Sequence, residues 1–154
     1  MKITYSALAL LLVLLACSKN EFETKPKISI KSVSSEFIPL GGSLGVRLEF
    51  KDKEGDVDDS LIVIRERLNM NSFAPPYQLK YDIPEFPDKS KGEFEVLLPY
   101  ATGLVLGLNP IDIPGSDKNE NDTLRLKFVV KDRAKNVSDT AIIDRIIVSR
   151  NITP

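Results

Sequence analysis

The feature that most constrains this chain is an alternation of apolar and polar residues with a period of two. It is clearest over residues 44–50 and 124–130. Successive side chains of a β-strand point to opposite faces, so such a segment buries one face and leaves the other in water. The alternation therefore predicts strands. The predicted strands are 27–33, 44–51, 60–68, 77–82, 92–98, 123–132 and 139–149.

No segment favours a long helix. The nearest candidate, residues 100–108, contains Gly103 and Gly107, and each glycine costs about 1 kcal/mol inside a helix. Seven short strands separated by turns rich in Gly, Pro and Asp are typical of two antiparallel sheets packed face to face. We predict an all-β fold, a seven-stranded immunoglobulin-like antiparallel β-sandwich over 27–150. An eight-stranded barrel would need more strands, and the long interruption at 100–122 suits a sandwich crossover better.

Composition excludes several classes of function. The chain of 154 residues has 21 Lys and Arg against 22 Asp and Glu, so no basic excess favours nucleic acid as a partner. His is absent, which removes the commonest general base and the commonest nitrogen ligand of transition metals. One Cys excludes an internal disulfide and any metal site with two thiolates. We therefore expect no catalytic residues.

The chain begins with an apolar run that is too short to cross a bilayer. Lys2 is the only charge before residues 7–16, which as a helix span roughly 15 Å, about half of the hydrocarbon thickness. Such a run is typical of a signal peptide. It ends in Leu-Leu-Ala-Cys at 14–17, which resembles the bacterial lipoprotein signal, in which the Cys is acylated. The alternative is an ordinary secretory signal with an incidental Cys.

The resemblance implies a signal peptide over 1–16, a lipidated Cys17 at the start of the mature chain, and a flexible polar tether up to residue 26. Residues 18–23 (Ser-Lys-Asn-Glu-Phe-Glu) are similar to the charged tether of surface lipoproteins of the Bacteroidota. Residue 18 is Ser, so the Asp that resembles an inner-membrane retention signal is absent. The expected location is the outer membrane or the cell surface, with the protein held there by its lipid.

Two motifs resemble strand ends of bacterial immunoglobulin-like, fibronectin-like and cadherin-like domains. The first is Leu-Glu-Phe-Lys-Asp-Lys-Glu-Gly-Asp at 48–56, and the second is Phe-Val-Val-Lys-Asp-Arg-Ala-Lys-Asn-Val-Ser at 128–138. Lys135 stands where the second pattern usually has Gly. Domains with these motifs have many unrelated functions, so the motifs support the fold and no activity.

The acidic segment after the second predicted strand is a candidate calcium site. Calcium takes six to eight oxygen ligands, which acidic residues at alternate positions of a loop can supply. In immunoglobulin order the loops 52–59 and 132–139 lie at the same end of the sandwich, so Asp132 and Asp139 would approach the first loop. The alternative is a solvated acidic turn. The candidate ligands are Asp52, Glu54, Asp56, Asp58 and Asp132.

The connection 100–122 is unusually long for a compact domain, and its first half is apolar. Either this half folds over an open end of the sandwich and completes the core, or it forms a hydrophobic patch that faces a partner. Tyr77, Tyr81 and Tyr100 form a second candidate surface, an aromatic platform for a glycan, provided that all three lie exposed on one face.

The expected function is a non-enzymatic binding or assembly role of a lipid-anchored cell-envelope protein, with the membrane and other envelope proteins as partners. The alternative is a carbohydrate-binding accessory lipoprotein of a glycan-uptake system. Hydrolysis of a glycosidic bond by paired carboxylates would require an apolar pocket that raises the pKa of one of them. The acids here lie in polar loops that contain Lys, so we expect no such activity. We expect no cofactor, and the alternative is calcium at the acidic loops.

Replacing Cys17 by Ala tests the predicted anchor. Several acyl chains hold a protein on a membrane almost permanently, because each buried methylene contributes about 0.8 kcal/mol. We expect the variant to lose incorporation of labelled palmitate in cells and to leave the membrane fraction. An unchanged mass and an unchanged membrane fraction would contradict lipidation at Cys17.

Overall fold

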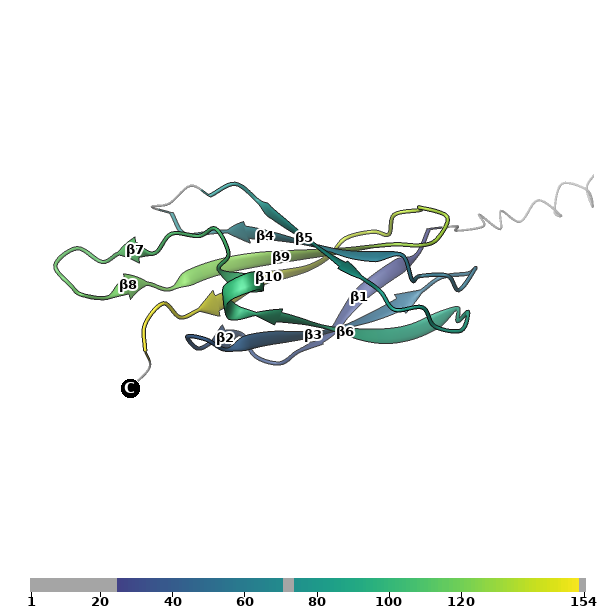
Figure 1. Cartoon of the computed structure of the whole chain (residues 1–154), viewed down its shortest axis with the longest axis horizontal. Coiled ribbons are helices and arrows are strands. Elements are labelled where there is room, and N and C mark those ends of the chain that lie inside the picture. Colours follow the sequence, from purple (N-terminus) through teal and green to yellow (C-terminus); the bar gives the residue numbers. More distant parts are fainter. Residues whose placement is uncertain (1–24, 71–73, 153–154) are drawn as a thin grey trace, which may run out of the picture.

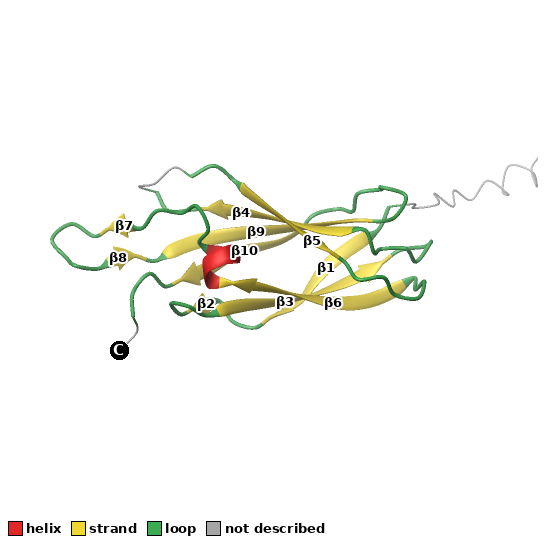
Figure 2. Cartoon of the chain, viewed as in Figure 1, coloured by secondary structure: helices red, strands yellow, loops and turns green. Residues whose placement is uncertain are grey.

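The computed structural model describes residues 25–70 and 74–152. The predicted signal peptide, the lipidated Cys17 and most of the predicted tether lie outside the described residues. The described chain is all-β, with ten strands and one short π-helical turn (Figure 2). These elements are β1 (Lys27–Val33), β2 (Phe37–Ile38), β3 (Ser43–Lys51), β4 (Ser60–Arg67), β5 (Tyr77–Asp82), β6 (Lys91–Pro99), η1 (Tyr100–Leu104), β7 (Ile111–Asp112), β8 (Asn119–Glu120), β9 (Asp122–Lys131) and β10 (Ala141–Val148).

Two sheets lie face to face in two layers (Figure 1). The first has the strand order β1-β3-β6 and is antiparallel throughout. The second has the order β2-β10-β9-β4-β5 and is antiparallel except where β2 pairs parallel with β10. The strands β7 and β8 form a separate antiparallel hairpin. No helix among the described residues is both long and apolar enough to span a membrane.

The prediction of an all-β fold is confirmed, whereas the predicted number of strands is wrong. Each of the seven predicted segments coincides with a strand to within two residues at either end. The three additional strands, β2, β7 and β8, have two residues each. Two residues are too few to carry a period-two pattern, so alternation in the sequence does not reveal strands of this length.

The hydrophobic core lies between the two main sheets and is built from alternate residues of their strands. In β9 every second residue from Asp122 to Val130 is buried, and the residues between them are half-buried. Burying one aliphatic or aromatic side chain of this kind contributes roughly 1.5–3 kcal/mol. The apolar residues of the described chain with an exposed fraction of at most 1% are Ile38, Leu44, Val46, Leu48, Val57, Val63, Leu98, Leu104, Leu124, Leu126, Phe128, Val130, Ile146 and Val148.

Two leucines of the apolar half of the connection 100–122 complete this core, as one of the two sequence interpretations predicts, whereas Leu106 and Ile113 of the same half are exposed. Leu104 is fully buried and Leu108 is 8% exposed. Gly103 permits the close approach, because a Cβ at this position would lie 3.1 Å from the Cα of Leu98. The polar half continues into the β7–β8 hairpin, which projects at one end of the molecule (Figure 1).

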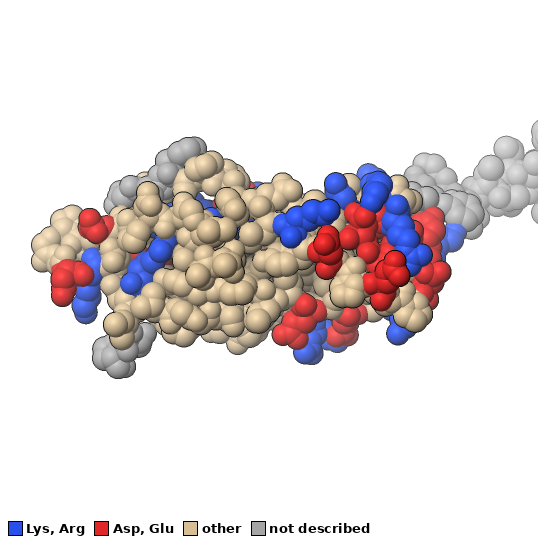
Figure 3. Space-filling model, in the orientation of Figure 1, with Lys and Arg blue, Asp and Glu red and all other residues tan. Residues whose placement is uncertain are grey.

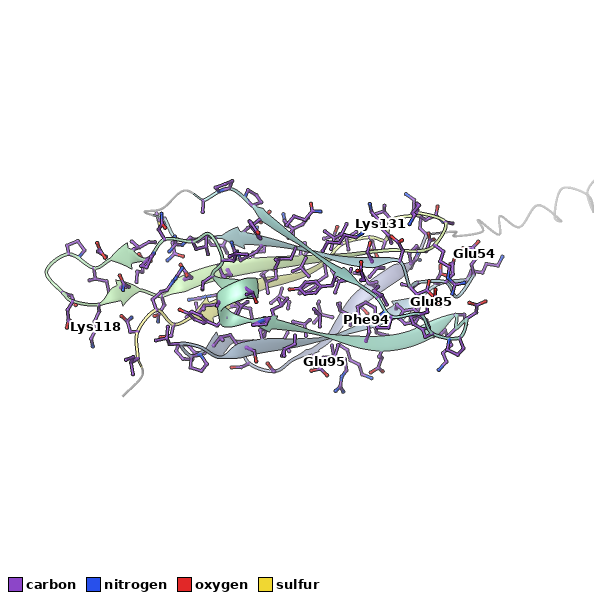
Figure 4. The ribbon with its side chains drawn as sticks, viewed as in Figure 1. Glu54, Glu85, Phe94, Glu95, Lys118 and Lys131 are labelled. Atoms are coloured by element: carbon purple, nitrogen blue, oxygen red, sulfur yellow. The ribbon has the colours of Figure 1, made fainter. Side chains whose placement is uncertain are left out.

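The molecule has two distinct ends. The strand β1 begins at one end, which also carries the β3–β4 and β9–β10 loops and which we call the anchor-side end, because the predicted anchor precedes β1 in the sequence (Figure 1). Glu54 and Lys131 lie there, whereas Lys118 lies in the hairpin at the opposite, distal end (Figure 4). The last described residues also lie toward the distal end.

Truncating Leu48 tests the core. Leu48 is fully buried in β3, between β1 and β6, so Leu48→Ala leaves a cavity and lowers the free energy of unfolding by about 2–5 kcal/mol. Glu49→Ala changes the opposite face of the same strand, and we expect an effect within about 0.5 kcal/mol. Denaturant unfolding of both variants measures the difference. Equal effects would contradict a core between the sheets.

Candidate metal centre

Four carboxylates converge at the anchor-side end. Asp52, Glu54 and Asp56 come from the β3–β4 loop, and Asp132 comes from the β9–β10 loop. One oxygen from each carboxylate lies within 4.8 Å of the corresponding oxygens of the other three. The convergence confirms the expectation that these two loops meet at one end of the sandwich.

The first loop folds around Asp52, which follows β3 directly. Its Oδ2 accepts hydrogen bonds from the backbone N–H of Gly55 (2.7 Å) and of Asp56 (3.1 Å). This is the turn that Asp favours by bonding to nearby backbone amides. Gly55 is required within it, since its φ is +79° and a Cβ there would lie 2.8 Å from the backbone nitrogen of Lys89. The turn places Glu54 and Asp56 beside Asp52.

The second loop folds in the same way around Asp132, which follows β9. Its Oδ1 accepts from the backbone N–H of Asn136 (2.7 Å), and its Oδ2 accepts from Nδ2 of Asn136 (2.8 Å). Lys135 has a φ of +69°, the conformation that explains why Gly is usual at this position. The loops are joined by a hydrogen bond from the Arg133 N–H to the Asp56 carbonyl (3.2 Å).

The surroundings of the cluster disfavour the charged form of Asp56. Asp52 is 4% exposed and Asp132 is fully buried. Oδ1 of Asp52 and Oδ1 of Asp56 are buried and accept no hydrogen bond, and an unsatisfied buried polar atom costs about 1–3 kcal/mol. Burial raises the pKa of Asp56 above its ordinary value, and so do, to a lesser degree, a hydrogen bond that its protonated form shares with Asp52 and the charges of Asp132 and Asp52. The cluster thus offers several negatively charged oxygens and no donor for two of them.

Asp58 does not belong to this cluster, which corrects the predicted ligand set. Both of its carboxylate oxygens accept from the Arg133 guanidinium, Oδ1 from Nε (2.8 Å) and Oδ2 from Nη2 (2.6 Å). Asp139 is also directed elsewhere, because its Oδ1 accepts from the backbone N–H of Ile28 (3.1 Å). Asp59 pairs with Lys135.

The three tyrosines do not share an exposed face, so the predicted aromatic platform is not formed. Tyr81 and Tyr100 are half-buried and contact the core. The Tyr100 hydroxyl donates to the carbonyl of Ser149 (2.8 Å). Tyr77 is 38% exposed, but the guanidinium carbon of Arg65 lies 5.1 Å from its ring centroid.

A second group of buried charges at the distal end was missed by the sequence analysis. Asp122 is fully buried and pairs with Arg67 and Arg150. Arg65 is 2% exposed and donates to backbone carbonyls after β6, including Leu104 (2.9 Å). These contacts fix the connection 100–108 against β4 and β9. A signal existed in the sequence, since Arg65 falls in the same alternation as the buried Leu61 and Val63.

Comparisons with known proteins give no family. No family model matches the chain, and no curated protein matches it. A β-glucosidase from Listeria innocua in complex with gluconolactone is similar in structure, with 12% identity and a TM-score of 0.41 over 84% of this chain and 16% of the enzyme. The sporulation control protein Spo0M from Bacillus subtilis has 14% identity and a TM-score of 0.38 over 82% of this chain and 50% of that protein. The chain spans half or less of either structure.

Replacing Asp56 by Asn tests the electrostatics of the cluster in metal-free buffer. The variant removes a charge that the folded state disfavours, so we expect a higher midpoint of thermal unfolding near neutral pH. A raised folded pKa means that the wild type loses stability as the pH rises through that pKa. The advantage of the variant should therefore shrink as the pH falls toward the ordinary value of 3.8.

The matched control is Asp59→Asn in the same loop. Lys135 lowers the pKa of Asp59, so the charged form stabilises the fold above the ordinary pKa and the substitution should not raise the midpoint. Thermal unfolding of the three proteins with chelator between about pH 4 and pH 8 measures these differences. A lower midpoint for Asp56→Asn at neutral pH would contradict the unfavourable charge.

Proposed function

We propose that this protein is a lipid-anchored module of the cell envelope that presents its distal end to another envelope protein, in a non-enzymatic binding or assembly role. The observation that carries this proposal is that the two ends of the domain differ in the elements they carry. The strand β1 begins at one end, and the β7–β8 hairpin lies at the other (Figure 1). Lys25 follows the predicted lipidated Cys17 by eight positions in the sequence, a length of chain that can span at most about 29 Å.

The distribution of side chains supports a distal binding surface. Lys, Arg, Asp and Glu gather over the anchor-side end in Figure 3, and the middle of the same face is largely uncharged. Several large apolar side chains are exposed in the connections at the distal end, and exposed apolar groups of this kind favour contact with another protein. They are Leu40, Leu68, Met70, Leu106 and Ile113.

The distal end is also ordered by hydrogen bonds, as a presented surface requires. The Asn119 N–H donates to Oδ1 of Asn151 (2.9 Å), and Nδ2 of Asn151 donates to the Asn119 carbonyl (2.7 Å). Ile113 and Lys118 are joined across the hairpin by a backbone hydrogen bond of 3.1 Å. A surface that is already ordered loses less conformational entropy when it binds a partner.

The strand order supports an immunoglobulin-like assignment of the domain. In that fold the strands A, B and E share one sheet, and the strands C, F and G form the other. If β1, β3 and β6 are taken as A, B and E, then β4, β9 and β10 correspond to C, F and G, and β5 is an added strand beside C. The short β2 continues the first strand onto the opposite sheet, beside the last strand.

The non-enzymatic part of the proposal rests on the roles that the buried charged groups already have. Asp122 balances buried arginines, and Asp58 is paired with Arg133. Asp52 and Asp132 each hold a turn through backbone amides. These contacts maintain the structure, and they give these four carboxylates roles other than acid–base chemistry.

Single cysteines at the two ends test the proposal in cells. The chain contains no Cys other than Cys17, so an introduced Cys is the only free thiol once Cys17 is acylated. Ser116 is exposed in the hairpin and Ser90 is exposed near the anchor-side end, which makes Ser116→Cys and Ser90→Cys a matched pair. We expect a thiol-reactive cross-linker to join Ser116→Cys to a defined envelope protein, with a much lower yield from Ser90→Cys. Equal yields from both positions, or no product from Ser116→Cys, would contradict distal presentation.

A further inference from the structure

We propose that Asp52, Glu54, Asp56 and Asp132 bind one calcium ion at the anchor-side end of the domain. This inference goes beyond the proposed function, which does not require a metal. Its first support is the convergence of four carboxylates from two loops that lie about 80 residues apart in the sequence, with one oxygen of each within 4.8 Å of the others. Opposite ligands of a calcium ion are about 4.6–5.2 Å apart, so four such oxygens fit around a single ion.

The second support is independent of the clustering and concerns one oxygen of Asp52. This residue is 4% exposed, and its Oδ2 is already used by two backbone amides. Its Oδ1 is buried and has no hydrogen-bond partner, and the same is true of Oδ1 of Asp56. The other side chains of the cluster are carboxylates, which when ionised only accept hydrogen bonds. A cation supplies the missing partner and offsets the charge, whereas a water molecule would supply only hydrogen bonds.

The hydrogen bonds of the two turns prepare the cluster for an ion. Both oxygens of Asp132 accept from Asn136, and Oδ2 of Asp52 accepts from the backbone, so the carboxylate planes are held in place before binding. Partners of this kind around metal ligands fix the orientation of the first coordination shell. Little conformational entropy is then lost when the ion binds.

The type and number of ligands favour calcium over other ions. The ligands are all oxygens, without the nitrogen or sulfur that zinc and copper prefer. Magnesium is usually held by one or two carboxylates and keeps several waters, whereas calcium accepts a larger set of carboxylates in a flexible geometry. Glu54 is exposed, so water can complete the coordination sphere on its side. We expect a dissociation constant of about 10⁻⁴–10⁻³ M, the range of extracellular calcium modules.

Thermal unfolding of the full-length lipoprotein in detergent tests the site. An ion that binds the folded state alone must raise the midpoint, and calcium at about ten times its dissociation constant should raise it by about 3–6 °C relative to chelator. Magnesium at the same concentration should have a clearly smaller effect. Equilibrium dialysis with labelled calcium should give one ion per chain. No shift at about 10 mM calcium, or equal shifts with both ions, would overturn the proposal.

Matched substitutions separate the site from general charge effects. Asp52→Asn keeps an oxygen for the backbone amides but removes the charge, and it should abolish the calcium shift. Asp59→Asn makes the same chemical change in the same loop, outside the cluster, and should retain the shift. Glu54→Gln alters an exposed ligand and should reduce the shift by at least half, which provides a test if Asp52→Asn does not fold. Retention of the full shift in Asp52→Asn or Glu54→Gln, or its loss in Asp59→Asn, would overturn the assignment.

Discussion

The structure depends on the burial of alternate side chains between the two main sheets. Strand β9 shows this constraint most clearly, because it lies between β4 and β10 and directs every second residue into the core. A shift of its register by one residue would expose Phe128 and bury Lys127, so the register is strongly specified. The ends of the strands, and hence the positions of all loops, follow from this register.

The same alternation also buries charges, and the fold accommodates them. Arg65, Arg67 and Asp122 occupy inward positions of β4 and β9. Buried ions are tolerated only when they are paired and hydrogen-bonded, and here the partners are one carboxylate and the carbonyl oxygens that follow β6. The connection 100–108 therefore closes the core with leucines, while its backbone carbonyl oxygens accept hydrogen bonds from the buried Arg65.

The β3–β4 and β9–β10 loops meet at the anchor-side end because β3 and β9, which belong to different sheets, both end there. Each loop turns around an Asp that directly follows its strand, and a hydrogen bond from Arg133 to Asp56 joins them. The turns that close the strands thus bring carboxylates together, and the proposed calcium ion would offset a charge that the fold itself concentrates. The distal end differs, because large apolar side chains are exposed there beside the charged residues of the hairpin (Figure 3).

The sequence alone determined the seven main strands, and it led to the expectation that the two acidic loops meet. Alternation is a local property that can be read from the sequence, and the expectation that the two loops share an end followed from it once an immunoglobulin-like strand order was assumed. Only the tertiary structure decided that Asp58 pairs with Arg133, 75 residues away, and that Tyr81 and Tyr100 contact the core. The two-residue strands and the partners of Asp122 could likewise not be derived from the sequence. The reason is physical. Period-two burial depends on neighbouring residues in the sequence, whereas the partner of each charged side chain depends on residues that only the packed sheets bring together.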